Sequence, residues 1–503
     1  MQKIILTKPF EQDWIRMFTH LANLFFEQSK IVVDPTEEGL PIDISVEKDA
    51  EGFLRGNTVL KIDDNVYTAT FTEPETSDGS ETENRQLKRI YSHVFLDVLE
   101  QYTGMQQSWG ILTGIRPTKL YHKYRQMGHD RETVKQLLMD KHRISEEKSE
   151  LLETIERVQL GAIPDLHEIK DEVSIYIGIP FCPTKCAYCT FPAYAIHRKN
   201  GRVESFLDGL HEEIREIGKW LTARDIKITT IYFGGGTPTS IEADEMDALY
   251  QTMYDSFPHM KEVREVTVEA GRPDTITPEK IDVLKKWGID RISVNPQSYT
   301  DETLKAIGRH HSVQETIDKF WLSRNMGMKN INMDLIIGLP NEGLEEFQHS
   351  LDETEKMQPE SLTVHTLSFK KASEMTRNKN KYKVADRKTV EQMMQLGENW
   401  TKQNGYVPYY LYRQKNILGN LENVGYAKPG EESLYNIIIM EEVQTIIGVG
   451  CGASSKFMEP ATGKITQFQN PKDPAAYILT FEEYIDKKIE HLERIFPEAV
   501  ITD

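Results

Sequence analysis

The sequence contains few cysteines and no long apolar run. Only four of its 503 residues are cysteine, so it is not a disulfide-rich scaffold, and we expect reduced thiols. The N-terminal stretch MQKIILTKPFEQDW has too short an apolar run for a signal peptide. The longest later run, near Ile437 to Met440, is far shorter than a membrane span. These features predict a cytoplasmic globular protein with no membrane span.

Basic residues are also scarce relative to acidic ones. Sixty Lys and Arg face 79 Asp and Glu, which gives a formal net charge of -19. Because phosphate backbones are bound by clustered Lys and Arg, nucleic acid is not expected as the main partner. A polyanionic small molecule would need a local basic pocket.

Three of the four cysteines lie within eight positions. Cys182, Cys186 and Cys189 form a CxxxCxxC pattern whose neighbouring prolines place it in a loop. Soft thiolates bind zinc, copper(I) or iron-sulfur clusters. A four-iron cluster normally has four thiolate ligands, so three thiolates leave one iron open to a ligand that is not protein. The alternatives are a structural zinc site with His197 as fourth ligand, or thiols clustered by chance.

From residue 171 onward, strand-like and helix-like segments alternate. Six such units predict parallel strands with right-handed crossovers, in a barrel or a doubly wound sheet. The chemically distinctive residues fall at or just beyond the strand C-termini, where parallel barrels build their sites. The predicted strands cover residues 174–179, 229–234, 265–270, 291–296, 331–338 and 362–368.

Two of these strand ends carry candidate ligand-binding groups. Gly235, Gly236 and Thr237 belong to the run GGGTP, whose backbone can approach a ligand and offer N–H groups to an anionic group. A tight strand-to-helix turn is the alternative. Glu269 ends the next strand, where its carboxylate can accept hydrogen bonds from a ribose or an ammonium group. Its alternative is an ordinary exposed side chain.

The N-terminal region has a different pattern of predicted helices and strands. A helix is predicted from about Glu11 to Gln28, followed by alternating strands with a hairpin turn at residues 63–65. The segment 110–120 carries Arg116 and Lys119, either in a capped turn or in a basic loop that faces the active site. We interpret this region as an accessory α+β domain.

The C-terminal region carries less specific signals. A helix is predicted over 388–404, and an amphipathic helix over 473–496 ends the chain. The string YYLYRQ at 409–414 is either a core or edge strand or an aromatic wall for a planar macrocycle. Cys451, far from the cysteine loop, is expected to be an inert buried thiol.

Several motifs together resemble the radical S-adenosylmethionine (SAM) superfamily. They are the cysteine loop with Tyr188 before its third cysteine, YxxIPFC, GGGTP and NxDLIxGLP. Within the superfamily, residues 170–455 are similar to the oxygen-independent coproporphyrinogen III oxidases, and the long N-terminal segment is most like the HemZ-type coproporphyrinogen dehydrogenases. The resemblance implies an α/β fold: a partial (β/α)6 barrel at 166–385, an N-terminal α+β accessory domain at 1–165, and a C-terminal α+β element at 386–503.

The resemblance also implies the cofactors. The three cysteines would bind a [4Fe-4S] cluster with SAM at the open iron. The residues matching the cofactor-binding positions are Tyr176, Tyr188, Gly235, Gly236, Thr237 and Glu269, with Gln297, Arg309 and Asp334 matching a second SAM. Two positions depart from the family pattern. Gly178 stands where the family usually has His. Phe191 stands where the oxidases have a further Cys and the haem chaperones have Phe.

The implied activity is that of an oxidoreductase of porphyrin and haem biosynthesis. A 5'-deoxyadenosyl radical would remove hydrogen from propionate side chains of coproporphyrinogen III, giving the vinyl groups of protoporphyrinogen IX. An electron donor such as flavodoxin or ferredoxin is implied as well. A haem chaperone and another tetrapyrrole-acting radical SAM enzyme are the alternatives. No substrate arginine is assigned among the candidates Arg272, Arg291, Arg309 and Arg413.

Overall fold

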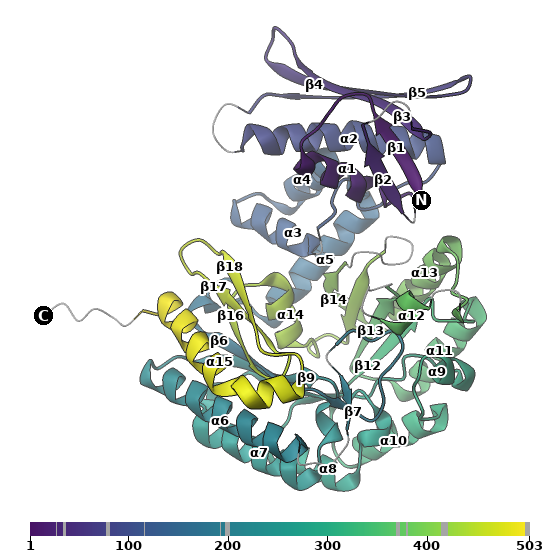
Figure 1. Ribbon diagram of the computed structural model, residues 1–503. Coiled ribbons are helices and arrows are strands. Elements are labelled where there is room, and N and C mark those ends of the chain that lie inside the picture. The colour runs from purple at the N-terminus through teal and green to yellow at the C-terminus, as the bar shows by residue number, and fades with distance from the viewer. Residues whose placement is uncertain are drawn as a thin grey trace, which may run out of the picture. The chain divides into compact units, whose positions relative to one another are not determined.

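The chain divides into two compact units (Figure 1), Met1–Glu156 and Arg157–Asp503. The structure is a computed structural model that describes residues 1–26, 28–33, 37–76, 81–114, 116–191, 193–196, 202–368, 373–378, 381–413 and 421–497. Each unit is described by itself. The predicted domain boundaries at residues 165 and 385 stay predictions.

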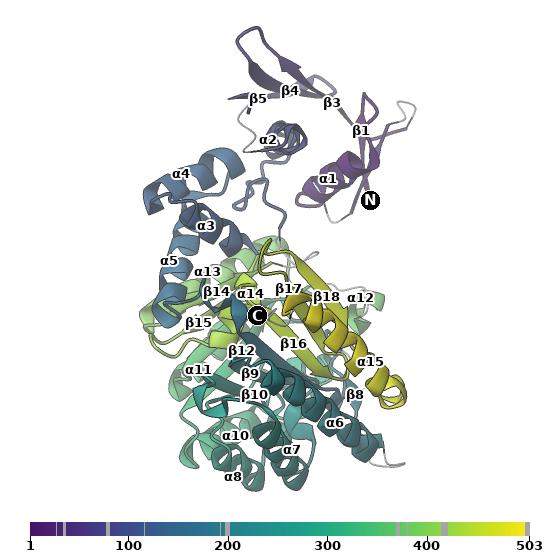
Figure 2. The same ribbon diagram turned by 90° about the vertical axis from the view of Figure 1, so that its left-hand side faces the viewer.

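The smaller unit is a five-stranded sheet with helices packed on one face (Figure 2). The strand order is β2-β1-β3-β4-β5, and α1 and α2 bury a core of mainly aliphatic and Phe side chains against the sheet. The strands are β1 (Gln2–Leu6), β2 (Ser29–Val32), β3 (Leu40–Lys48), β4 (Phe53–Ile62) and β5 (Asn65–Pro74). The helices are α1 (Gln12–Ala22), α2 (Glu83–Thr103), α3 (Pro117–Gln126), α4 (Arg131–His142) and α5 (Glu146–Ala162), the last crossing into the larger unit.

Local sequence explains most of this unit, including the β4–β5 hairpin. Asp63 has a φ of 52° in the two-residue turn, which confirms the predicted hairpin. The first helix is shorter than predicted, because it ends at Ala22 rather than near Gln28. Asn23 Oδ1 accepts hydrogen bonds from the Ser29 backbone N–H at 2.9 Å and from its hydroxyl at 2.7 Å, which turns the chain into β2. Arg116 and Lys119 lie at the start of α3, and their predicted role facing a substrate stays a prediction.

The larger unit is built on one eleven-stranded sheet, in the order β14-β15-β13-β12-β11-β10-β9-β6-β16-β17-β18. The run from β13 to β16 is parallel throughout. Its strands are β6 (Val173–Ile179), β9 (Ile228–Gly235), β10 (Glu265–Glu269), β11 (Arg291–Ser293), β12 (Asn330–Ile337), β13 (Ser361–Thr366) and β16 (Thr445–Gly450). The six predicted strands are all present. β16 adds a seventh parallel strand that comes from the C-terminal region.

Antiparallel strands and helices complete this unit. The antiparallel strands are β14 (Val407–Tyr412), β15 (Asn423–Ala427), β17 (Ser454–Met458) and β18 (Ile465–Gln469), and a two-stranded ribbon is formed by β7 (Phe181–Cys182) and β8 (Tyr194–Ala195). The helices are α6 (Arg202–Ala223), α7 (Ala243–Ser256), α8 (Pro278–Lys286), α9 (Asp301–Ala306), α10 (Val313–Asn325), α11 (Leu344–Met357), α12 (Glu374–Arg377), α13 (Arg387–Gln403), α14 (Leu434–Glu441) and α15 (Pro474–Ile495). Helices α6, α7, α8, α10 and α11 follow one another along the outside of the curved sheet. The predicted α/β fold class is confirmed.

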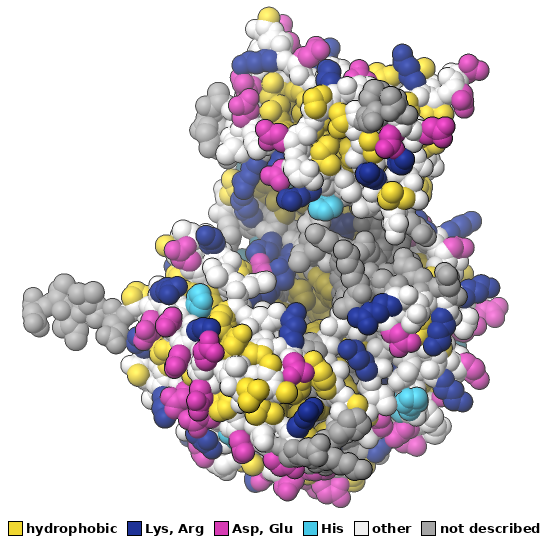
Figure 3. Space-filling model, in the orientation of Figure 1, with side chains coloured by type: hydrophobic (Ala, Val, Ile, Leu, Met, Phe, Trp, Pro, Cys, Tyr) yellow, Lys and Arg dark blue, Asp and Glu magenta, His cyan; other side chains and the backbone are white. Residues whose placement is uncertain are grey.

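The surface carries both signs of charge. Acidic and basic side chains are mixed over the visible face of each unit (Figure 3), although the chain as a whole has a formal net charge of -19. Within the described ranges, no helix combines the length and the apolar character needed to cross a bilayer.

Candidate functional site

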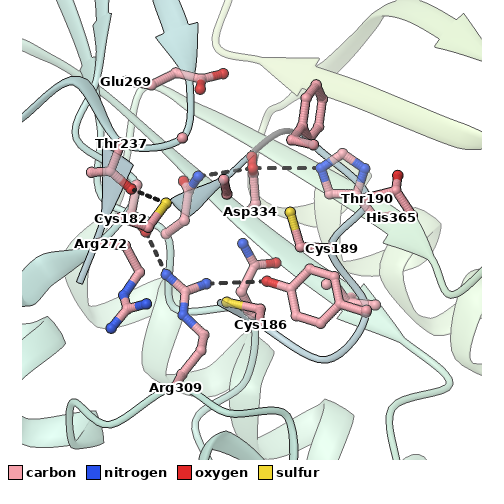
Figure 4. Close-up of a pocket in the computed structure, with 18 of the residues that line it drawn as sticks. Cys182, Cys186, Cys189, Thr190, Thr237, Glu269, Arg272, Arg309, Asp334 and His365 are labelled. Atoms are coloured by element: carbon pink, nitrogen blue, oxygen red, sulfur yellow. Dashed lines mark hydrogen bonds and ion pairs between the residues drawn. The ribbon is translucent and has the colours of Figure 1, made fainter. Parts of the chain in front are cut away.

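A cavity lies at the C-terminal ends of the parallel strands of the larger unit. Figure 4 shows its polar side chains, with the three cysteine sulfurs surrounding a shared space. Of the twelve residues predicted from the sequence, eleven line it. They are Cys182, Cys186, Cys189, Tyr188, Gly235, Gly236, Thr237, Glu269, Gln297, Arg309 and Asp334. Their contacts with cofactors stay predictions.

The cysteine loop is held by the end of β9. The N–H of Gly236 donates to the Ile179 carbonyl and the N–H of Thr237 to the Phe181 carbonyl, both at 2.7 Å. The Thr237 hydroxyl lies 3.3 Å from Cys182 Sγ. A backbone ladder and a side-chain contact therefore both place the first cysteine of the loop.

The glycines of the GGGTP run are explained by this close backbone approach. A Cβ at Gly236 would lie 2.5 Å from the Phe181 carbonyl oxygen, and one at Gly235 would lie 2.9 Å from that of Ile179. Gly235 also has a φ of +106°, which side-chain-bearing residues rarely adopt. The sequence interpretation assigned these glycines to a ligand, whereas their contacts also make them necessary for placing the cysteine loop.

We expect Gly236→Ala to displace the cysteine loop. The added methyl must move the Phe181 backbone, so the larger unit should lose about 1–3 kcal/mol of stability, and less iron should be retained after anaerobic reconstitution. Iron content and thermal unfolding measure the two effects. Gly161→Ala is the control, because a methyl there meets no atom within 4 Å. Equal iron retention by the two variants would contradict the prediction.

A second anchor of the cysteine loop is Arg272. Its guanidinium forms a bidentate pair with Asp274 at 2.8 and 3.0 Å and donates to the backbone and hydroxyl oxygens of Thr184 at 3.1 and 3.0 Å. The Thr184 hydroxyl in turn donates to the Gly308 carbonyl at 3.0 Å. Arg272 is thus a positioning residue that joins the loop to the segments after β10 and α9.

The three thiols are the candidate metal ligands of the cavity, and Cys182 is the most buried of them. Burial, the largest influence, raises the pKa of Cys182 to about 11, so without a metal this thiol is protonated at neutral pH. Among the described residues, no three Cys, His, Asp or Glu side chains converge as ligands of a single metal ion. His197, the proposed fourth zinc ligand, lies outside the described residues.

A buried cation lies beneath the cysteines. Arg309 is only 1% exposed. Its Nη2 donates to the Gly271 carbonyl, and its Nη1 donates to the Tyr188 hydroxyl at 3.4 Å. Burial opposes its charge, yet the nearby Tyr188 and Cys186 raise its pKa. Arg309 thus places positive charge beside the thiols and within reach of an anionic ligand.

The carboxyl group of Glu269 has a pKa close to neutral pH. Burial raises its pKa to about 7 against the lowering effect of the hydrogen bond from Tyr232, while Asp334 adds a further increase. The rings of Tyr176, Tyr232 and Tyr435 form a stack of three nearly parallel rings that all contact one another. The centroids lie 6.1 Å apart for Tyr176 and Tyr232, 4.4 Å for Tyr232 and Tyr435, and 6.4 Å for Tyr176 and Tyr435. Tyr176 belongs to this stack and is the one predicted site residue that is absent from the described cavity lining. Its predicted contact with the cofactors stays a prediction.

Asp334 is the centre of a polar network at the other side of the cavity. Its carboxylate accepts hydrogen bonds from Asn295 Nδ2 at 2.9 Å and Asn332 Nδ2 at 2.8 Å, and it lies 3.5 Å from His365 Nε2. His365 Nδ1 is 3.2 Å from the Tyr412 hydroxyl. Of the YYLYRQ string, Tyr412 lines the cavity, whereas Tyr409 and Tyr410 are buried in the edge strand β14.

His365 and Tyr412 also line the cavity. Asn295, which sequence reasoning missed, lines it as well and lies two positions before Gln297 at the same strand end. That spacing could have identified it. Among the arginine candidates, Arg291 lies at the opposite end of β11, where it donates to Ser361 at 2.8 Å. Arg413 is buried and does not line the cavity.

The unusual Gly178 is explained by the C-terminal region. Gly178 pairs with Gly450 across β6 and β16, and a Cβ at Gly178 would lie 2.9 Å from the Cys451 carbonyl oxygen. A histidine side chain there would require the turn after β16 to move. The added strand β16 and the turn after it therefore occupy the space that a side chain at position 178 would need.

Comparisons with known proteins give the family. The profile of the Radical SAM superfamily matches residues 176–354. The chain is 59% identical over 490 residues to the oxygen-independent coproporphyrinogen-III oxidase-like protein HemZ of Bacillus subtilis, covering 96% of each chain. It is 28% identical over 327 residues to the heme chaperone HemW of Haemophilus influenzae, covering 64% of this chain and 80% of that one.

A solved structure agrees in fold. Coproporphyrinogen III oxidase (HemN) of Escherichia coli has a TM-score of 0.51 at 20% identity, over 67% of this chain and 72% of that chain. From the sequence match along nearly its whole length and the shared fold, the chain belongs to the radical SAM superfamily and, within it, to the HemZ family of oxygen-independent coproporphyrinogen III oxidase-like proteins.

Proposed function

We propose that this protein catalyses the anaerobic oxidative decarboxylation of two propionate groups of coproporphyrinogen III to vinyl groups, giving protoporphyrinogen IX. The observation that carries the proposal is the meeting of three thiols, Glu269 and Arg309 in one cavity at the ends of the parallel strands. The 59% identity to a HemZ protein supports the substrate class. We further propose a cytoplasmic location and a flavodoxin or ferredoxin as electron donor.

The superfamily uses a [4Fe-4S] cluster and SAM, and the described residues fit both. The three thiols surround a shared space, and the buried Gln297 Oε1 has no hydrogen-bond partner among the described residues. When bound, the cluster and SAM supply a 5'-deoxyadenosyl radical able to take a hydrogen atom from a propionate β-carbon. Loss of carbon dioxide and of one electron to an acceptor then leaves each vinyl group.

The chain's own residues would bind and orient the ligands and exclude water from the cavity. Arg272 holds the cysteine loop, since its donors are engaged by Asp274 and Thr184. Arg309 offers a buried positive charge to a carboxylate of SAM or of the substrate. Ile336 and Leu367 give the cavity apolar lining, which limits water near the reacting carbon.

Anaerobic turnover tests the proposal. The full chain is reconstituted with iron and sulfide, then given SAM, a reductant and coproporphyrinogen III. We expect protoporphyrinogen IX together with 5'-deoxyadenosine, at two cleaved SAM molecules per product. An intact cluster that cleaves SAM but gives no vinyl product would refute the assignment of this substrate.

A haem chaperone is the second candidate, because relatives named as heme chaperones match 39 to 64% of the chain and Phe191 follows their pattern. Phe191 is 57% exposed at the edge of the cavity. Both ring nitrogens of His365 already lie near Tyr412 and Asp334, so haem ligation by this side chain would require one of those contacts to break. Stable haem binding by the reconstituted protein, without vinyl product, would favour this candidate.

A further inference from the structure

Exposed cations surround the outer side of the cysteine loop. Lys185, between the first two cysteines, is exposed, and so are Lys305 on α9, Arg377 on α12 and Lys383 before α13. None of the four belongs to the described lining of the cavity. Within the described ranges of the chain, none of them forms an ion pair with a carboxylate. Their charges are therefore available to a partner outside the chain.

The four cations belong to one surface, because backbone contacts and a shared core join their segments. The Ala187 N–H donates to the Ile307 carbonyl at 2.9 Å, and the Met375 N–H donates to the Ala187 carbonyl at 3.1 Å. Ala187, Leu304, Met375 and Tyr382 are all buried in a single apolar cluster. Each of the four cations lies one or two positions along the chain from a member of this cluster.

The charge of this surface is opposite to that of the whole chain. The formal net charge of -19 repels an acidic protein at long range, so such a partner needs a local group of cations to attract and orient it. Glu374 on α12 does not cancel that group. Its carboxylate already lies 3.8 Å from Lys381 Nζ and accepts a hydrogen bond from the Tyr382 hydroxyl at 3.1 Å.

The surface also lies close to the candidate cluster ligands. Lys185 directly precedes Cys186, whose side chain is partly exposed, whereas Cys182 is buried. Because electron transfer slows steeply with distance, a redox protein must dock where the cluster ligands come near the surface. Among the described residues, the loop that carries Lys185 meets this condition, and its exposed Phe191 adds an apolar contact of the kind found at interfaces.

We propose that Lys185, Lys305, Arg377 and Lys383 form the docking surface for an acidic flavin-carrying redox protein. The reduced flavin of the partner is oxidised by one electron, and the cluster at the three thiols is reduced by that electron. Redox encounters of this kind are small, usually burying less than about 1,200 Å², so a few cations around one loop are sufficient. The inference rests on the electron donor of the proposed function and is independent of the tetrapyrrole substrate.

Titration calorimetry of the reconstituted full chain with an oxidised, acidic flavodoxin tests the surface. The test variant combines Lys305→Glu and Arg377→Glu. The matched control combines Lys261→Glu and Lys329→Glu, which change the net charge by the same amount. Lys261 and Lys329 are also exposed, but they precede β10 and β12 and so lie near the opposite ends of the parallel strands. Formation of 5'-deoxyadenosine from SAM is measured in parallel, with either reduced flavodoxin or dithionite as reductant.

The test variant is expected to bind flavodoxin about tenfold more weakly and with a smaller dependence on salt. Its flavodoxin-driven SAM cleavage should fall with the affinity, while its dithionite-driven cleavage stays at the wild-type rate. The control should match the wild type in every measurement.

Three results would each overturn the proposal. They are no flavodoxin binding by the wild type, equal affinities of the test and control variants, and an equal loss of flavodoxin-driven and dithionite-driven cleavage in the test variant. Neither readout requires coproporphyrinogen III. Absence of a vinyl product would therefore refute the proposed function while leaving the docking surface in place.

Discussion

Cys186→Ala is expected to abolish the brown iron-sulfur absorbance and the cleavage of SAM together. Cys186 is one of three thiols that line the same cavity, and its loss leaves two ligands for a four-iron cluster. Cys451→Ala should leave both properties intact. The Cys451 thiol is 2% exposed and donates to the Pro471 carbonyl at 3.3 Å. Burial, with the charges of Asp473 and Glu213, raises its pKa to about 12, so it stays a protonated thiol.

Anaerobic reconstitution followed by absorbance, iron and sulfide analysis and 5'-deoxyadenosine measurement checks this pair of variants. Circular dichroism of each variant shows whether the fold is kept. Loss of the cluster from a folded Cys451→Ala protein would contradict the three-thiol assignment. Retention of SAM cleavage by Cys186→Ala would contradict it equally.

Lys488→Met is expected to destabilise the larger unit by about 3–5 kcal/mol, because it leaves a buried carboxylate without its cation. Lys488 and Glu213 are both fully buried and form an ion pair. The Glu213 carboxylate also accepts hydrogen bonds from the Gly450 N–H at 2.7 Å and the Tyr477 hydroxyl at 2.6 Å. The pair therefore joins α6, β16 and α15 directly behind the turn that packs on Gly178.

Denaturant unfolding, followed at the transition of the larger unit, measures the loss of stability. Iron retention after reconstitution should fall together with the stability. Lys487→Met is the control, since Lys487 is the neighbouring residue on α15 and pairs with Glu483 on the exposed surface. No measurable change is expected there, because exposed pairs contribute little. If the two variants are equally stable, the buried pair does not make the expected contribution to the stability of the larger unit.

The strand and helix pattern of the larger unit could be predicted because its signals are local. Each parallel strand is a short β-branched and apolar segment, and α13 and α15 begin within a residue of their predicted starts. The length of the helix at Gln12–Ala22 was overestimated from the sequence. The helix ends where Asn23 contacts Ser29, and hydrophobic periodicity does not show that contact. The place of β16 beside β6 was missed, because the partner strands are more than 260 residues apart in the sequence.

The candidate site was predicted in its chemistry and only partly in its geometry. The signal of Cys182, Cys186 and Cys189 lies in their spacing, and the strand-end position of Glu269 follows from the βα alternation. The role of Arg272 as a clamp on Thr184 could not be predicted, since 88 residues separate the two. The departure at Gly178 was visible in the sequence, but its cause lies in Cys451.

What the sequence determined by itself is the chemistry: three thiols on one short loop and a series of parallel strands that bring their C-terminal ends together. Those features are local, and they persist whichever segments pack around them. Only the tertiary structure decided that the glycine run supports the loop backbone, that Asp334 is shared by Asn295 and His365, and that a buried Glu213 and Lys488 pair stands behind the site. These depend on contacts between distant segments, whose pairing and burial are set by packing rather than by any local pattern.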